Sequence, residues 1–188
     1  MPVSLTNIID NEHPGYVSGR YYLGTEKVSA DTSSTGGLST SGITYVPFRV
    51  HSPIQLSRLA VYCSSSSSNG NAIIGIYSNL NGLPEDLVID GGNLIITTPG
   101  VKEAITSYSA KRAWYWFAGI TSQAPSLYCG LSFVGNNHIL GQAAPSSITV
   151  NCALRNAGAY ASLPAKAPKD NLSFITGNFH PLFWFKVA

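Results

Sequence analysis

Apolar and polar residues alternate over short stretches along most of the chain, and turn-forming residues separate these stretches. Alternation with a period of two is typical of β-strands. The separating segments SSNGN, NLNGLPED, TPG, QAPS and GNN are rich in residues that form turns. No segment of useful length has the apolar spacing of an amphipathic helix. The predicted strands cover residues 19–25, 43–50, 56–63, 72–78, 93–98, 101–108, 113–120, 127–134, 147–154 and 181–188.

Evenly spaced short strands predict an all-β fold, namely an antiparallel β-sandwich of jelly-roll-like type. A chain of 188 residues is long enough for one well-buried domain and short for two. We therefore expect a single sandwich domain over residues 19–188, preceded by a polar N-terminal arm over residues 1–18. Residues 155–180 are expected to be a long surface loop with a short strand around LSFIT.

The stretch AWYWFAGI, residues 113–120, is apolar on both faces of its predicted strand. Trp114 and Trp116 point to one side, while Tyr115 and Phe117 point to the other. We expect a central strand with the two tryptophans in the core between the sheets. The other two rings would be packed by a loop or by a neighbouring subunit. In the alternative, the strand shows an aromatic face to a sugar.

Composition narrows the choice of partner. Asp, Glu, Lys and Arg make up only 11% of the residues, against roughly a quarter in an average soluble protein. The basic residues are dispersed and the net charge is only +2, so we expect no nucleic-acid partner. No apolar run approaches the roughly 20 residues that cross a bilayer, and the first residues lack a signal-peptide pattern. The expectation is a soluble protein without membrane insertion.

Three cysteines, Cys63, Cys129 and Cys152, lie in apolar stretches and have no CxxC spacing. We expect them to be buried and unbridged, as in a protein that folds under reducing conditions.

No motif in the sequence indicates catalysis. The four histidines have no HxH or HxxxH spacing, and GxSxG, GxGxxG and P-loop patterns are missing. Glu85, Asp86 and Asp90 follow a turn, but their spacing matches no calcium loop. We therefore predict a protein that is not an enzyme, with no catalytic residues, no cofactor and no metal.

Five stretches occur in a recognisable order: GRYYLGT, ITYVPFRV, LSRLAVYC, AIIGIYSNLNGLPEDLVIDGGNL and TPGVKEAITSYSAKRAWYWFAGI. Together they resemble a β-sandwich module of tailed-bacteriophage virion surface proteins, both tail-fibre and capsid-surface types. The resemblance covers about residues 19–120 and marks no catalytic residue. Its most specific parts are AWYWFAGI and GIYSNLNGLPEDLVIDGG.

The second of these parts has a physical interpretation. Gly82 and Pro84 would set the backbone of a turn within NLNGLPED. Leu87 and Ile89 would then point into the core, and Asp90 with the following glycine would close the next turn.

The resemblance implies a non-enzymatic structural protein of the virion, assembled in the bacterial cytoplasm. Because the chain has no heptads, collagen-like repeat or β-helical shaft, we expect a capsid decoration or cement protein. It would act as an oligomer, a trimer being the first expectation, and bind the major capsid protein or tail proteins. The alternative is a tail-fibre or spike module that recognises host-surface glycans. Candidate partner-binding residues are Leu5, Ile8, Ile9, Tyr115 and Phe117.

Overall fold

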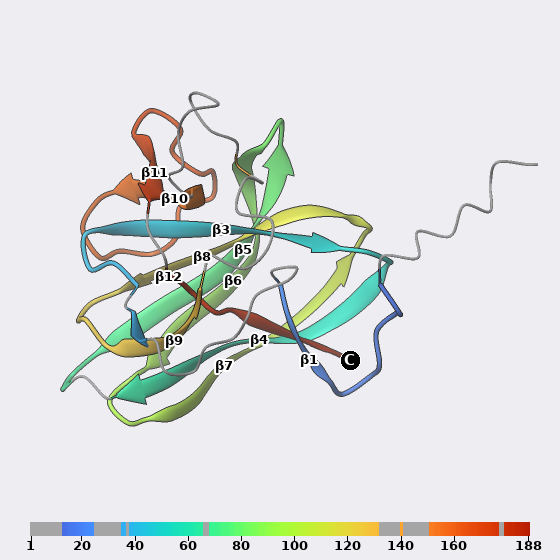
Figure 1. Ribbon diagram of the computed structural model, residues 1–188, viewed down its shortest axis with the longest axis horizontal. Coiled ribbons are helices and arrows are strands. Elements are labelled where there is room, and N and C mark those ends of the chain that lie inside the picture. Colours follow the sequence, from blue (N-terminus) through green and yellow to red (C-terminus); the bar gives the residue numbers. More distant parts are fainter. Residues whose placement is uncertain are drawn as a thin grey trace, which may run out of the picture.

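The computed structural model describes residues 13–24, 35–36, 38–65, 68–131, 140, 151–176 and 179–188. These residues form two antiparallel sheets that pack face to face around a shared apolar core (Figure 1). The predicted all-β antiparallel sandwich is therefore confirmed. Within the described ranges, no helix has the length and apolar character that crossing a membrane requires.

One sheet has six strands in the order β11-β10-β3-β8-β5-β6, and all neighbours are antiparallel. Its strands are β3 (Gly42–Val50), β5 (Asn71–Leu80), β6 (Leu83–Ile95), β8 (Ala113–Thr121), β10 (Asn151–Ala157) and β11 (Leu172–Thr176).

The other sheet has seven strands and is organised around β4. One edge of β4 pairs with β7, and the other edge pairs first with β13 and then with β9. β1 pairs with β13, while β2 and β12 both pair with β9. The bounds are β1 (Tyr21–Leu23), β2 (Thr35–Gly36), β4 (Ile54–Ser65), β7 (Gly100–Ala110), β9 (Ser126–Leu131), β12 (Phe179–Pro181) and β13 (Trp184–Val187).

The turn between β5 and β6 is shorter than predicted, and Pro84 is not part of it, because Pro84 lies in β6 and pairs with Asn79. Asn81 and Gly82 both have positive φ, 53° and 81°, and they are flanked by the paired residues Leu80 and Leu83. An Asn-Gly pair with two positive φ angles is the favoured two-residue hairpin turn. Because the turn uses only two residues, β6 starts at once, and the predicted separate strand over residues 93–98 is wrong.

Irregular pairing in β6 changes which side chains face the core. Asp90 does not close a turn; its Oδ1 accepts a hydrogen bond from the Gly92 N–H (2.9 Å) at a bulge where Gly92 has a φ of +66°. A second register shift, at Val88, separates Leu87 from Ile89. Ile89 therefore packs between the sheets, as predicted, whereas Leu87 packs on the outer face, contrary to the prediction.

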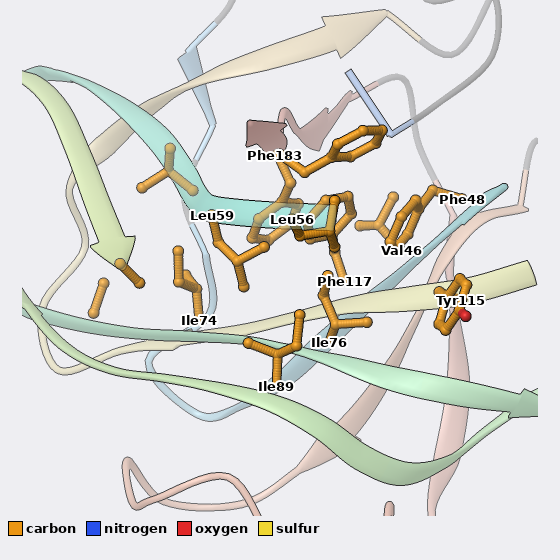
Figure 2. Packing of buried hydrophobic residues seen from close by; sticks show 14 of the residues in the cluster. Val46, Phe48, Leu56, Leu59, Ile74, Ile76, Ile89, Tyr115, Phe117 and Phe183 are labelled. Atoms are coloured by element: carbon orange, nitrogen blue, oxygen red, sulfur yellow. The ribbon is translucent and has the colours of Figure 1, made fainter. Parts of the chain in front are cut away.

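Stacked phenylalanines form the centre of the core between the sheets (Figure 2). The ring centroids of Phe48 and Phe117 are 4.1 Å apart, and those of Phe117 and Phe183 are 5.1 Å apart. Leu56 and Leu59 approach these rings from β4 in the opposite sheet. Burial of this apolar surface is the main favourable contribution to folding.

The last residues of the predicted N-terminal arm lie against the sandwich. Tyr16 is partly buried, and its ring meets Tyr22 edge-on with centroids 4.9 Å apart. Its hydroxyl accepts a hydrogen bond from the His51 N–H (3.2 Å). The predicted contact residues Leu5, Ile8 and Ile9 lie outside the described residues.

Candidate functional site

Strand β8 contains the aromatic stretch singled out in the sequence. It lies between β3 and β5, so the predicted central position is confirmed. Its faces are the reverse of the prediction. Phe117 and Tyr115, with 1% and 5% exposure, are in the core between the sheets, whereas Trp116 packs in a second cluster on the outer face. Tyr115 and Phe117 are therefore core residues that offer no surface to a partner.

This second cluster exists because a loop covers the outer face of the six-stranded sheet. Residues 158–171 connect β10 to β11, and they place Leu163 and Ala167 over Trp116 and its neighbours. The predicted short strand around LSFIT is confirmed as β11, whereas the predicted loop over residues 155–180 is shorter, because β10 continues to Ala157 and β12 begins at Phe179. The buried members of the cluster are Tyr45, Ile73, Tyr77, Trp116, Ala118, Ile120, Leu154, Leu163 and Ala167.

Backbone and hydroxyl hydrogen bonds fix this loop to the sheet. The Tyr77 hydroxyl donates to the carbonyl of Pro164 (2.6 Å). The Leu87 N–H donates to the Ala165 carbonyl (2.9 Å), and the Ala167 N–H donates to the Glu85 carbonyl (2.8 Å). Burial raises the pKa of Tyr77, so its hydroxyl remains protonated and able to donate. The loop thus extends the pairing at the free edge of β6.

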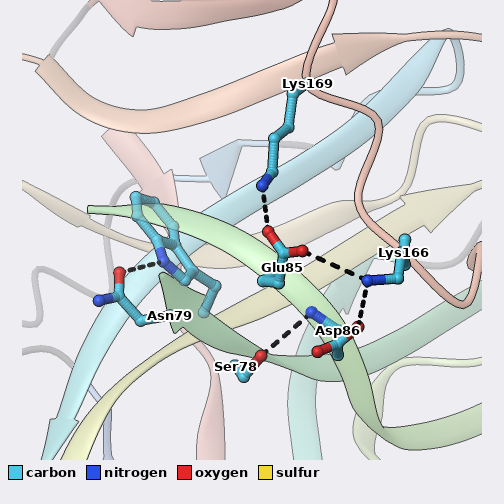
Figure 3. A network of polar contacts seen from close by, with 7 residues as sticks. Ser78, Asn79, Glu85, Asp86, Lys166 and Lys169 are labelled. Atoms are coloured by element: carbon cyan, nitrogen blue, oxygen red, sulfur yellow. Dashed lines mark hydrogen bonds and ion pairs between the residues drawn. The ribbon is translucent and has the colours of Figure 1, made fainter. Parts of the chain in front are cut away.

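Ion pairs add to this attachment (Figure 3). Lys166 Nζ lies 3.4 Å from Glu85 Oε1 and 3.2 Å from Asp86 Oδ1, and Lys169 also binds Glu85. The hydrogen bond from Lys169 is the main reason why the pKa of Glu85 is lowered. Of the three carboxylates considered for calcium, Glu85 and Asp86 therefore bind lysines, and Asp90 accepts the Gly92 N–H. Within the described ranges, no group of three or more His, Cys, Asp or Glu side chains could hold a metal ion.

The covering loop leaves an open groove near the N-terminal end of β8, with a volume of about 620 Å³. Strands β3, β5, β6, β8, β10 and β11 all contribute to its walls. The lining residues are Pro47, Asn79, Asn81, Gly82, Leu83, Trp114, Trp116, Leu140, Leu154 and Phe174.

Aromatic rings and amides give the groove its chemistry. Trp116 is almost fully buried, and its Nε1–H donates to Asn79 Oδ1 (2.9 Å), which fixes both side chains. The amide nitrogen of Asn79 points away from this bond (Figure 3). Trp114 is half-buried and Phe174 is 53% exposed, so both rings are accessible to a ligand.

None of the described residues that line the groove is titratable. The groove therefore has no general acid, general base or charged nucleophile of its own among them. Its residues can stack on a ligand and exchange hydrogen bonds with it. This chemistry is suited to binding.

The cysteines do not contribute to the groove. Cys63 and Cys129 are buried, as predicted, and burial raises the pKa of Cys129 to about 11. Cys152 is only half-buried, and its thiol donates to the carbonyl of Ile175 (3.4 Å). Because the thiolate is the reactive form, Cys129 is a poor nucleophile at neutral pH.

Sequence reasoning singled out Trp114 and Trp116 but missed Asn79, Leu154 and Phe174. The latter two face each other across the β10–β11 pair, which is a long-range contact without a local sequence signal. Comparison of the chain with protein-family models, curated proteins and solved structures gave no match. A function must therefore be inferred from the groove itself.

Proposed function

We propose that this protein is a non-enzymatic binding module whose ligand is a glycan, held in the groove beside Trp114. The observation that supports this proposal is the presence of accessible aromatic rings and amide groups in one uncharged groove. A sugar ring presents C–H groups on its faces and hydroxyl groups at its rim. The faces of aromatic rings carry partial negative charge and attract C–H groups. Amides donate to and accept from hydroxyls.

The groove also has a suitable size and degree of order. A volume of about 620 Å³ lies within the range of roughly 300–1,000 Å³ that is usual for small-ligand sites. The Trp116–Asn79 hydrogen bond holds one ring and one amide in place before a ligand arrives. Such preorganisation reduces the entropy lost on binding.

The resemblance to virion surface modules suggests a biological setting for this proposal. The protein would be a receptor-binding module on a tail fibre or spike of a bacteriophage particle. Its ligand would be a glycan of the host surface.

The experiment is a binding screen of the intact protein on an array of bacterial lipopolysaccharides, capsular polysaccharides and neutral oligosaccharides. We expect at least one glycan to bind, and Trp114→Ala to weaken its binding by about tenfold or more, equivalent to about 1.4 kcal/mol. The matched control is Ile95→Ala, which removes an exposed apolar side chain that does not line the groove. Absence of binding by every glycan, or unchanged binding after Trp114→Ala and Phe174→Ala, would overturn the proposal.

A structural role as an oligomeric decoration protein of the capsid is the second candidate. It is favoured by exposed apolar side chains on the edge strands, with Ile95 in β6 65% exposed and Ile105 in β7 79% exposed. Exposed apolar surface often marks an interface between proteins. Light scattering should then report an oligomer, first of all a trimer, that Ile105→Lys dissociates. A monomeric wild-type protein at micromolar concentration would count against this candidate.

A further inference from the structure

The outer face of the seven-stranded sheet carries a hollow of about 400 Å³, on the side of the sandwich opposite the groove. Strand pairing places Trp184 beside Ala60, Ala60 beside Glu103, and Tyr62 beside Val101. Phe185 and Leu59, which alternate with these residues along their strands, pack in the core between the sheets. The lining residues are Tyr21, Ala60, Val61, Tyr62, Val101, Glu103, Tyr128 and Trp184.

Small and large side chains together shape this hollow. Ala60, with a single methyl group, lies between Trp184 and Glu103 in the sheet. On one side, the rings of Tyr62 and Tyr128 stack with centroids 4.1 Å apart and planes within 20°. Each tyrosine restricts the movement of the other, so they form a preformed aromatic wall.

A polar group is held in a fixed orientation beside these rings. The Tyr21 hydroxyl donates a hydrogen bond to Glu103 Oε1, and Arg58 Nη1 lies 3.6 Å from Glu103 Oε2. Lys186 Nζ lies 5.2 Å from the centre of the Tyr21 ring. The side chain of Glu103 remains 29% exposed. The carboxylate, which lines the hollow, can accept hydrogen bonds from a ligand.

This arrangement favours a neutral ligand with many hydroxyl groups. Glu103 is already balanced by Arg58, so no unpaired negative charge is left to attract a cation. Because the Arg58–Glu103 pair carries no net charge, it gives an anion no strong attraction either. A neutral sugar needs no such attraction, because its hydroxyls both donate and accept while its ring stacks on aromatic faces.

We infer that this hollow is a second sugar-binding site, specific for a neutral glycan and centred on Trp184. The inference rests on the proposed function for the class of ligand, but its site shares no described lining residue with the groove. The two sites lie on opposite outer faces of the sandwich, so both can be occupied at once.

The three tryptophans of the chain allow the two sites to be monitored separately. Trp114 and Trp116 line the groove, and Trp184 lines the hollow. The intact protein is labelled with 5-fluorotryptophan, and its fluorine resonances are assigned by single Trp→Phe substitutions. The probes are hexasaccharides of glucose, N-acetylglucosamine, mannose and xylose.

We expect at least one hexasaccharide to shift the Trp184 resonance in a saturable manner, and the shift to persist in Trp114→Ala. Tyr62→Ala should weaken this binding by about tenfold or more, because it removes half of the stacked wall. Ser107→Ala is the matched control in the same strand β7, since Ser107 is exposed and does not line the hollow. It should leave the affinity unchanged.

Other outcomes would overturn the inference in distinguishable ways. Shifts of Trp114 or Trp116 without any shift of Trp184 would refute the second site and leave the proposed function standing. A Trp184 shift that depends on protein concentration and not on sugar would identify the hollow as a contact between two copies of the chain. If no resonance responds to any hexasaccharide, the second site is refuted, and the groove also fails to bind these sugars.

Discussion

Trp114 and Trp116 are two residues apart on one side of β8, yet their environments differ. Trp116 is buried beneath the loop of residues 158–171 and donates a hydrogen bond to Asn79. Trp114 is half-buried at the open groove. A fully buried ring contributes to stability, whereas an accessible ring is available to a ligand. Strand alternation puts both rings on one face. Their roles differ because the loop of residues 158–171 covers Trp116 and leaves Trp114 accessible at the groove.

Truncation of these two side chains should therefore have different effects on stability. We expect Trp116→Ala to lower the free energy of unfolding by about 3–5 kcal/mol, as is usual for a buried aromatic ring. Trp114→Ala, the matched control two residues away, should cause a much smaller loss. Urea unfolding followed by circular dichroism measures both values. Equal losses for the two variants would contradict the assignment of one ring to the core and the other to the groove.

The orientation of Tyr115 and Phe117 could not be predicted from the sequence. The stretch AWYWFAGI is apolar at every position, so alternation identifies two faces but does not say which one meets the opposite sheet. The structure buries both faces, one against the other sheet and one against residues 158–171. The covering segment is rich in small residues and has no apolar periodicity that would have revealed its role.

At the scale of elements, the position of a turn could be predicted from the sequence more reliably than the length of a strand. The turn predicted within NLNGLPED is formed by the Asn-Gly pair at residues 81–82, both at positive φ, without Pro84. The length of β6 was missed because Gly91 and Gly92, which suggest a break, form a bulge inside a continuous strand. Glycine in a strand pattern is compatible with either outcome.

The attachment of the loop of residues 158–171 to β6 should depend on pH. Lys169 and Lys166 lower the pKa of Glu85, so their stabilising effect is present above the ordinary pKa of a glutamate. It is lost as the pH falls through the lowered pKa of Glu85. The pKa of Lys166 is raised, mainly by Asp86, so its contribution is lost only when strongly alkaline solution deprotonates it. We expect the loop to loosen in acid, starting below about pH 5.

Hydrogen exchange at the Leu87 and Ala167 amides, which bridge the loop and β6, measures this loosening. Protection of both amides should fall as the pH is lowered towards 3, after correction for the intrinsic exchange rate. Glu85→Gln should show reduced protection already at pH 6.5. Asp170→Asn, which removes an exposed carboxylate in the same loop, is the matched control. Identical protection in all three proteins across the pH range would refute the role of the ion pairs.

At the scale of the whole molecule, the sandwich could be predicted because alternation and turn signals are local properties of the sequence. The groove could not be predicted, because its walls come from six strands that are distant in sequence. The hollow on the other sheet was missed for the same reason, since Trp184 meets Glu103 only through the intervening β4. Functional surfaces of this kind depend on strand order, which the local pattern of apolar, polar and turn-forming residues does not determine.

Strand β13 should be indispensable to the fold, because it lies between β1 and β4 and places Phe185 in the core. We expect a chain truncated after Phe183 to lack a cooperative unfolding transition and to be recovered mainly as insoluble protein. Lys186→Ala, a change in the same strand outside the core, should fold normally. Circular dichroism and the soluble yield report both results. A cooperative transition in the truncated chain would show that β13 is dispensable.

The interior position of β13 also bears on the synthesis of the protein. The ribosome makes β4 long before β13. The edge of β4 that pairs with residues 184–187 therefore stays unpaired until β13 has been synthesised. At roughly 5–20 residues per second, the delay between these two strands is about 6–24 s. During this interval the nascent chain exposes unpaired backbone groups of the kind that promote aggregation. We expect chaperones to bind this edge of β4 until residues 184–187 leave the ribosome.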